Sequence, residues 1–372
     1  MMEVDYDNLR VNILYEIIFI SFNIPNKPSM KQLALLVILS FIFFDGMSQS
    51  EPSKVSAFIN EGIKLHDQKK YDEAIAIYKE ALKLEPDNAS ANYEIAFSFM
   101  GIGQTNEAIP YLEKVTKTKN RVTVSAYDLL GSIYDNMDQK DKAIEFFKKG
   151  IQADPTYQRI YYNTAITYLR MGKEKEAIPY LLQALNRDPN HASGHNLYAS
   201  LMAKNPETKI DAILAYCNFL ILEPTSARSA TSFIELKKLL GSGVAKSDKG
   251  NEITLSNGTD VDRNAANLAI SLSDVASLIP GLSENEKLGQ QLKSIFSIVG
   301  ELAEKKASKD FFWTYYADYF GKIGKSEYMP MVAHIIGFTA NQEENRKWIT
   351  ANDAQLQDFN KWRIAIPRKV SM

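Results

Sequence analysis

Small residues recur along this chain at a nearly constant interval, and that interval restricts the fold more than any other feature of the sequence. An alanine returns every 34 or 35 residues, at Ala74, Ala108, Ala143, Ala177 and Ala212. A second series keeps the same interval about one helix length earlier, at Gly62, Ala96, Gly131, Ala165 and Ala199. A fixed period of a few tens of residues indicates an array of equivalent units. The chain is therefore predicted to contain five units of two helices each.

Each unit also carries large side chains placed to fill the seam between its two helices, because residues three and four apart share one helix face. Four residues after each alanine of the first series stand Tyr78, Leu112, Phe147, Leu181 and Tyr216. Four of the five units close on a proline, at Pro86, Pro155, Pro189 and Pro224. A single helix pair cannot bury both of its faces, so the pairs are expected to stack on their neighbours.

The period, the small residues, the aromatic positions and the closing prolines resemble the tetratricopeptide repeat family. The resemblance covers roughly residues 55–224, about half of the chain. It implies a right-handed α-solenoid of about five helix pairs within an all-α fold. It also implies a non-catalytic interaction scaffold that binds a protein or peptide.

Two units depart from the family pattern. The second unit has Asn92 where its siblings have an aromatic residue or histidine, and it ends in "KTKNRVT" without a proline and with one extra residue. Its junction with the third unit is expected to be looser. The fifth unit has its extra residue in a polar turn that contains Pro206.

The segment Met30–Ser50 has the order of a secretory signal peptide. Lys31 gives a short basic start, a twelve-residue apolar run extends from Leu33 to Phe44, and small residues follow up to Ser50. Because a membrane span needs about 18 apolar residues, cleavage after Ser48 or Ser50 is expected. The protein is thus predicted to be exported, periplasmic or secreted, with no cysteine after the run for a lipid anchor. An uncleaved anchor helix, which would give a membrane-tethered scaffold, is the alternative.

Composition changes along the chain predict five segments. Gly, Ser, Asp and Asn gather before residue 263 and include a short hairpin near residues 251–258. Helical periodicity then returns, with Leu268 and Leu272 on one stripe and Ser283 as the cap of a second helix. The predicted segments are a non-native or disordered extension at 1–29, the signal peptide at 30–50, the solenoid with a capping helix at 51–241, a linker at 242–262 and a separate C-terminal helical domain at 263–372.

Bulk charge and cysteine content limit the classes of partner and site. A formal net charge of -2 at pH 7 gives no footprint for nucleic acid. The single cysteine, Cys217, excludes an internal disulfide framework and a cysteine-rich metal site. Its position on a repeat helix predicts a small core residue.

Motifs that carry catalytic chemistry were sought because a solenoid can carry an enzyme. The sequence contains no Gly-rich phosphate loop, nucleophile elbow, zincin histidine pair or calcium loop, so no catalysis and no cofactor are predicted. His191 and His195 are four apart, but His195 occupies a repeat core position and a third ligand is not evident, so no metal is predicted. The aromatic run 311–320 is interpreted as core rather than as a sugar-binding platform or a membrane-facing stripe. The alternative function is an enzyme acting on envelope polymers, with its site in the C-terminal domain and the repeats as a docking arm.

The resemblance implies a binding groove, because in this family the first helix of each unit lines the concave surface. Mapped onto this chain, the groove residues chosen as ligand-binding are Ile59, Tyr93, Phe97, Met100, Asp128, Asp135, Arg159, Tyr162 and Ile166. Apolar side chains with a few charges suit a peptide or a helix. The alternative is that the C-terminal domain folds back over them.

One partner class is not expected. Clamps that hold a chaperone's C-terminal carboxylate place Lys and Asn on the groove helices of the first two units. This chain has Ile59, Ile63 and Glu94 there.

Overall fold

The computed structural model describes residues 53–242, 244–247, 250–253, 260–277, 280–306, 310–368 and 370. The predicted signal peptide and the segment before it lie outside these residues. The chain divides into two compact units, Met1–Glu94 and Ile95–Met372, and each is described by itself.

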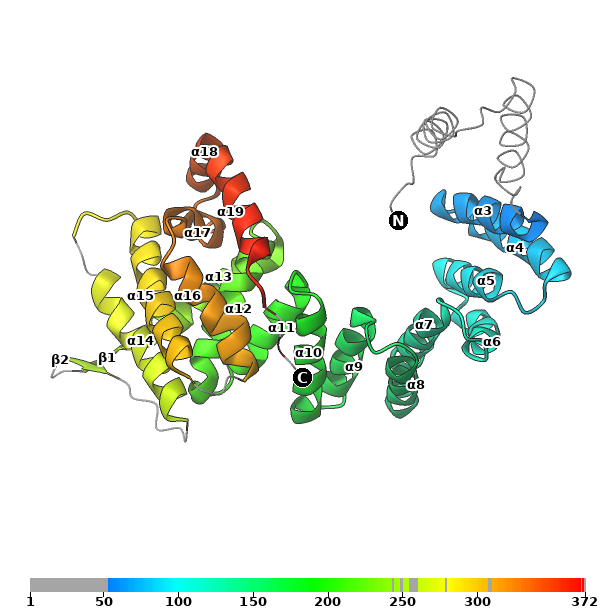
Figure 1. The fold of residues 1–372 in the computed structure, drawn as a ribbon, viewed down its shortest axis with the longest axis horizontal. Coiled ribbons are helices and arrows are strands. Elements are labelled where there is room, and N and C mark those ends of the chain that lie inside the picture. Colours follow the sequence, from blue (N-terminus) through cyan, green and yellow to red (C-terminus); the bar gives the residue numbers. More distant parts are fainter. Residues whose placement is uncertain are drawn as a thin grey trace, which may run out of the picture. The chain divides into compact units, whose positions relative to one another are not determined.

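Five helix pairs and one further helix account for residues 54–240, as the repeat period predicts (Figure 1). The pairs are α3 (Lys54–Asp67) with α4 (Tyr71–Leu84), α5 (Ala89–Gly101) with α6 (Thr105–Thr116), α7 (Thr123–Asn136) with α8 (Lys140–Ala153), α9 (Gln158–Arg170) with α10 (Glu174–Arg187), and α11 (Ala192–Met202) with α12 (Lys209–Leu222). The helix α13 (Ala227–Leu240) follows and lies where the capping helix was predicted, after the fifth pair and before residue 241. A short 3-10 helix, η1 (Pro206–Thr208), forms the polar turn of the fifth pair.

The turn inside each of the first four pairs has the same backbone shape. One residue takes a positive φ in each turn, namely Lys69 (62°), Gly103 (76°), Asp138 (63°) and Gly172 (71°). The next residue donates its N–H to a carbonyl five positions back, as Lys70 does to Leu65 at 2.9 Å and Lys173 to Tyr168 at 2.9 Å. These bonds satisfy carbonyls that the helix end leaves without a partner. Glycine suits this position because it has no Cβ, whereas lysine is strained there.

Small residues make room for aromatic rings in the seam of a pair. A Cβ added to Gly62 would lie 2.3 Å from Cε1 of Tyr78, and one added to Gly131 would lie 2.4 Å from Cε1 of Phe147. The ring four residues after the alanine therefore fills the space at the glycine. Ala143, the alanine of the third pair, is fully buried.

A hydrogen bond to the carbonyl of the closing proline also recurs. Asn92 Nδ2 donates to Pro86 O at 3.1 Å, and Tyr161 Oη donates to Pro155 O at 2.9 Å. His195 Nε2 makes the same contact with Pro189 O at 3.1 Å. Asn92 departs from its siblings in size but keeps their hydrogen bond.

A two-stranded antiparallel hairpin follows α13. Its strands are β1 (Val244–Ser247) and β2 (Gly250–Ile253), with Val244 opposite Ile253. The predicted position of the hairpin, near residues 251–258, was therefore wrong, because those residues supply part of the second strand at most. Residues 254–259 lie outside the described residues.

The C-terminal part is helical, as predicted. Its elements are α14 (Val261–Ser277), α15 (Glu284–Lys305), a π-helical segment η2 (Phe312–Ala317), α16 (Asp318–Gly324), α17 (Met329–Ile336), α18 (Gln342–Ala351) and α19 (Asp353–Ala365). Ser283 and Glu286 form the predicted capping box of α15. The predicted apolar stripe of α14 was wrong at Leu272, which is 47% exposed, whereas Ala266 and Ile270 are buried.

One hydrophobic core joins the last repeat helices to the C-terminal helices. The helix α12 is buried on nearly all sides, since every residue from Ile210 to Ile221 is buried. The helices α14 and α17 and the segment η2 contact it. Figure 1 shows α14 and α17 in the same group of helices as α12. Cys217 lies fully buried within α12, as predicted. The aromatic run is also core, because Phe312, Tyr316, Tyr319 and Phe320 are at most 1% exposed.

Candidate binding surface on the repeat helices

The predicted groove residues lie on the first helices of the pairs and differ in exposure. In the first compact unit, Ile59 on α3 and Tyr93 on α5 are half-buried. In the second, Phe97 is 44% exposed and Met100 is half-buried. Apolar side chains thus remain partly accessible at the predicted positions of these helices.

Asp128 on α7 holds Arg159 on α9 in place. The Asp128 side chain is only 1% exposed, and it accepts hydrogen bonds from Arg159 Nε at 2.6 Å and Asn163 Nδ2 at 2.8 Å. Burial raises the pKa of Asp128, while the Arg159 charge and the two hydrogen bonds oppose that rise. The Arg159 side chain is 54% exposed. The carboxylate is therefore a buried anchor, and the guanidinium is the group presented to solvent.

Asp135 and Arg170 repeat this arrangement at the other end of the same two helices. Arg170 Nη1 pairs with Asp135 Oδ2, and the Asp135 side chain is 7% exposed while that of Arg170 is 51% exposed. Oδ1 of Asp135 is buried and has no hydrogen-bond partner within the described part of the chain. Sequence reasoning chose Asp135 and missed Arg170. Arg170 stands 35 residues after Asp135, one repeat period, and that spacing was the signal that could have identified the pair.

Tyr162 on α9 lies beside the first turn of α11. Its ring meets the His191 ring edge-on, with 4.5 Å between centroids. Burial raises the pKa of Tyr162, and the nearby Arg228 charge opposes that rise. Arg228, on α13, donates to Ser193 Oγ at 2.8 Å and to Glu223 Oε1 at 2.6 Å. Arg228 of α13 thus connects the polar side chains of Ser193 and Glu223 near Tyr162.

The two histidines of the fifth unit have structural roles. His191 Nδ1 accepts the N–H of Gly194 at 3.0 Å and so caps α11. His195 is fully buried, and its Nε2 must donate to the Pro189 carbonyl, so its Nδ1 accepts from Tyr316 Oη at 2.7 Å. Burial, aided by the charge of Arg368, lowers the pKa of His195 to about 3. Both ring nitrogens of His195 are therefore engaged within the fold.

The C-terminal helices make their polar contacts with the end of the repeat stack. Tyr315 Oη donates to Leu185 O at 3.0 Å, and Arg368 Nη2 donates to Asn218 Oδ1 at 2.8 Å. Asn186 Nδ2 donates to Val370 O at 2.7 Å. These contacts fall on α10 and α12, whereas the predicted groove residues lie on α3, α5, α7 and α9.

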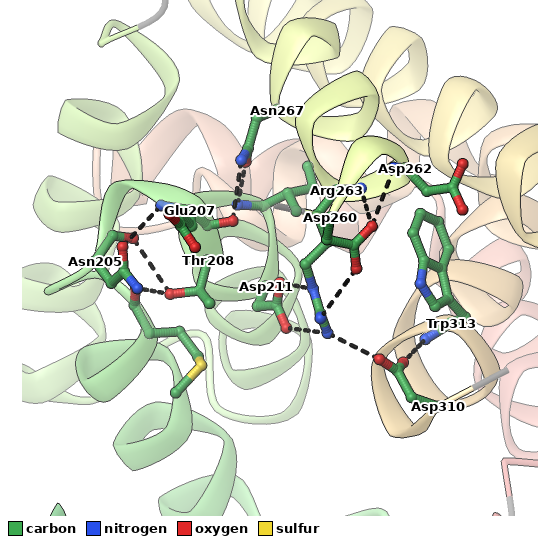
Figure 2. A network of polar contacts seen from close by, with 12 residues as sticks. Asn205, Glu207, Thr208, Asp211, Asp260, Asp262, Arg263, Asn267, Asp310 and Trp313 are labelled. Atoms are coloured by element: carbon green, nitrogen blue, oxygen red, sulfur yellow. Dashed lines mark hydrogen bonds and ion pairs between the residues drawn. The ribbon is translucent and has the colours of Figure 1, made fainter. Parts of the chain in front are cut away.

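Figure 2 shows the polar network that joins α12 to α14. Arg263 on α14 reaches Asp211 on α12, with Nε 3.3 Å from Oδ2, and its Nη2 lies 3.2 Å from Asp310 Oδ2. Tyr198 Oη donates to Asp211 Oδ1 at 3.1 Å. Asn267 Oδ1 accepts the N–H of Ile210 at 3.0 Å and so caps α12 from the neighbouring helix. Burial raises the pKa of Asp211 to about 6, although the Arg263 charge acts in the opposite direction.

In the described part of the chain, no three His, Cys, Asp or Glu side chains gather so as to hold a metal ion. None of its helices combines the length and apolar character that a membrane span requires.

Comparison with known proteins identifies the repeats. Two family models match, one described as TPR repeat over residues 62–109 and one described as tetratricopeptide repeat over residues 138–221. The peroxisomal targeting signal receptor of Komagataella phaffii is 26% identical over 169 residues, which are 43% of this chain and 29% of the receptor. The bovine BBSome complex member BBS4 is 27% identical over 122 residues, 33% of this chain and 23% of that protein. The chain thus spans less than a third of the length of these relatives.

Solved structures give similar matches. A crystal structure of MamA is 25% identical, with a TM-score of 0.35, and covers 48% of this chain and 92% of that one. PilF of Pseudomonas aeruginosa is 21% identical, with a TM-score of 0.46, and covers 61% of this chain and 93% of that one. The repeat period, the five helix pairs and the two family models agree. The chain therefore carries tetratricopeptide repeats.

Proposed function

We propose that this protein is an exported, non-catalytic scaffold whose repeat helices bind a peptide segment of another protein. One observation carries the proposal. The helix α9 presents Arg159 and Arg170, each half-exposed and each fixed by a buried carboxylate of α7, beside the partly buried side chains of Tyr162 and Ile166. Charged groups that are already held in position lose little conformational freedom when a ligand arrives.

The chemistry of this surface favours a polypeptide ligand. A guanidinium carries five N–H donors, and Asp135 engages one nitrogen of Arg170, which leaves donors for peptide carbonyls or carboxylates. Tyr162 and Ile166 offer apolar contact for a side chain between these polar groups. This combination of apolar anchors with a few polar groups is typical of peptide grooves.

Export and the absence of catalysis belong to the same proposal. The order of basic, apolar and small residues in 30–50 supports export. The rival function, an enzyme acting on envelope polymers with its site in the C-terminal domain, finds no exposed aromatic platform at residues 311–320, because Phe312, Tyr316 and Phe320 are core residues.

The binding proposal is tested with a peptide selected against the full chain from a random library. Isothermal titration calorimetry then compares the wild type with Tyr162→Ala and with Tyr93→Ala combined with Phe97→Ala. Loss of a central anchor typically costs about 2 kcal/mol or more, so each variant should bind at least about thirtyfold more weakly.

Tyr168→Ala is the matched control, because the Tyr168 ring stacks on Tyr180 within the seam of the fourth pair, with centroids 5.5 Å apart. It should lower the melting temperature and leave peptide affinity unchanged at 15 °C. If selected peptides bound all these variants with wild-type affinity, the ligand surface would lie elsewhere.

A further inference from the structure

The irregular end of the second repeat unit borders a cavity of about 670 Å³. The loop between α6 and α7 forms one wall, and the C-terminal end of α8 with Asp154 forms another. Its lining includes the charged residues Lys117, Lys119, Arg121, Lys149 and Asp154. The predicted groove residues Asp128, Asp135 and Arg159 are not part of the lining, so this cavity is a separate surface.

Hydrogen bonds fix the backbone of the loop. Thr123 is 7% exposed, and its hydroxyl accepts the N–H of Asn120 at 3.1 Å and donates to Thr118 O at 3.1 Å. Thr118 Oγ1 donates to Val115 O at 2.8 Å. Tyr127 Oη donates to Thr116 O at 3.3 Å. The loop therefore has a defined path, and its side chains project from fixed positions.

The lining carries a marked excess of positive charge. Lys117, Lys119, Arg121 and Lys149 are set against a single carboxylate, Asp154. This local excess occurs in a chain whose formal net charge is -2. A concentration of one sign of charge at a recess attracts ligands of the opposite sign.

The nearby carboxylates, Asp154 and Glu145, already have hydrogen-bond or ion-pair partners. Asp154 accepts hydrogen bonds from the N–H and the hydroxyl of Thr156, at 2.8 and 2.6 Å, and these bonds lower its pKa. Lys149 pairs with Glu145 at 2.6 Å. Lys117, Lys119 and Arg121 have no carboxylate at ion-pair distance among residues that the structure describes. The three loop cations thus supply charge that the fold itself does not use.

We propose that this cavity binds an acidic segment of a polypeptide partner, through Lys117, Lys119 and Arg121. Three cations at alternate positions of the loop match several carboxylates along one chain better than they match a single small anion. The hydroxyls and amides of the lining, such as Thr118, Asn120 and Gln152, can bond to peptide carbonyls and N–H groups. The site adds a second, charge-selective contact surface to the repeat region.

The test measures fluorescence anisotropy of labelled hexaglutamate with the full chain at 50 mM NaCl. Lys119→Glu combined with Arg121→Glu should weaken binding at least tenfold. Lys173→Glu combined with Lys175→Glu changes the net charge equally at exposed positions at the start of α10, and should stay within about twofold of wild type. Lys119→Gln with Arg121→Gln, which adds no repulsion, serves if the first variant does not fold.

Each outcome decides the proposal. Selective loss in the loop variants, together with weaker binding of wild type at 300 mM NaCl, supports it. Equal losses in the loop and control variants would show attraction by net charge alone and overturn it. Tripolyphosphate that displaces the labelled peptide at a lower concentration than unlabelled hexaglutamate would assign the cavity to phosphate ligands and overturn it as well. Because the groove residues are untouched, failure here leaves the groove proposal standing.

Discussion

Two buried titratable groups near the end of the repeat stack should make the stability of this protein depend on pH in opposite directions. His195 has a pKa of about 3 in the folded chain against an ordinary value of 6.5. Because the folded pKa is lowered, the buried neutral ring costs no stability above pH 6.5. The free energy of unfolding then decreases as the pH falls below that value. Asp211 has a folded pKa of about 6 against 3.8, so its contribution is most favourable below pH 3.8 and is lost as the pH rises through 6.

The magnitudes follow from linkage. Between pH 7 and pH 5, His195 should lower the free energy of unfolding by about 2 kcal/mol, because the unfolded chain gains the proton that the buried ring excludes. Over the same interval Asp211 should raise it by about 1 kcal/mol, because the folded carboxyl gains its proton first. In the wild type the two effects largely cancel, and the net loss should be about 1 kcal/mol or less.

Single substitutions should separate the two effects. Asp211→Asn removes the favourable contribution, so its stability should fall by about 2 kcal/mol from pH 7 to pH 5. His195→Asn removes the unfavourable one, so its stability should rise by about 1 kcal/mol over that interval. Asn92 occupies the equivalent position in the second unit and donates to the closing proline Pro86, so asparagine can still make this hydrogen bond.

Urea unfolding followed by tryptophan fluorescence measures these values, since Trp313 is 1% exposed in the same core. Each variant is compared with itself at the two pH values, so any constant loss of stability drops out. Parallel pH dependence in the wild type and both variants would refute the reasoning. It would mean that neither His195 nor Asp211 has a shifted pKa in the folded chain.

Three further substitutions or measurements test other parts of the fold. Ala143→Leu should overpack the seam of the third pair and cost about 1–3 kcal/mol, with faster hydrogen exchange in the neighbouring pairs as well; faster exchange in that pair alone would contradict stacking. Lys69→Gly should raise the stability of the first pair by up to about 1 kcal/mol in thermal melts, because Lys69 has a φ of 62°; a loss of stability would show that its side-chain contacts outweigh backbone strain. The intact mass of the exported protein should match a chain that begins between Gln49 and Glu51. A mass that shows a chain retaining Met30 would rule out the predicted cleavage.

The repeat period was sufficient to predict the helix pairs, because small residues and rings at fixed spacing specify which faces meet. It could not show that Asp128 and Asp135 are buried. Both were chosen as groove charges, and the structure places their carboxylates beneath Arg159 and Arg170. The 35-residue spacing could have indicated that Asp135 and Arg170 are neighbours, but it does not show that the carboxylates are buried beneath the guanidinium groups.

The C-terminal part was harder to predict because its helices follow no repeat. The periodicity of α14 suggested that Leu272 faces the core, but Leu272 is exposed, and the polar side chain of Asn267 caps α12. The contact of Tyr316 with His195 spans 121 residues and left no local signal in the sequence. The cavity beside Arg121 was visible in the sequence only as an irregular unit end, without any indication of a binding role.

Photo-crosslinking from the proposed groove tests the central claim most directly. A benzophenone amino acid replaces Ile166, which is half-buried and stands between Arg159 and Arg170 in the sequence of α9. A second protein carries it at the exposed position of Glu176 on α10. With a library-selected peptide bound, irradiation should join the peptide to position 166 and leave position 176 unreacted. Crosslinking from position 176 with none from position 166 would contradict binding on the first helices of the repeats.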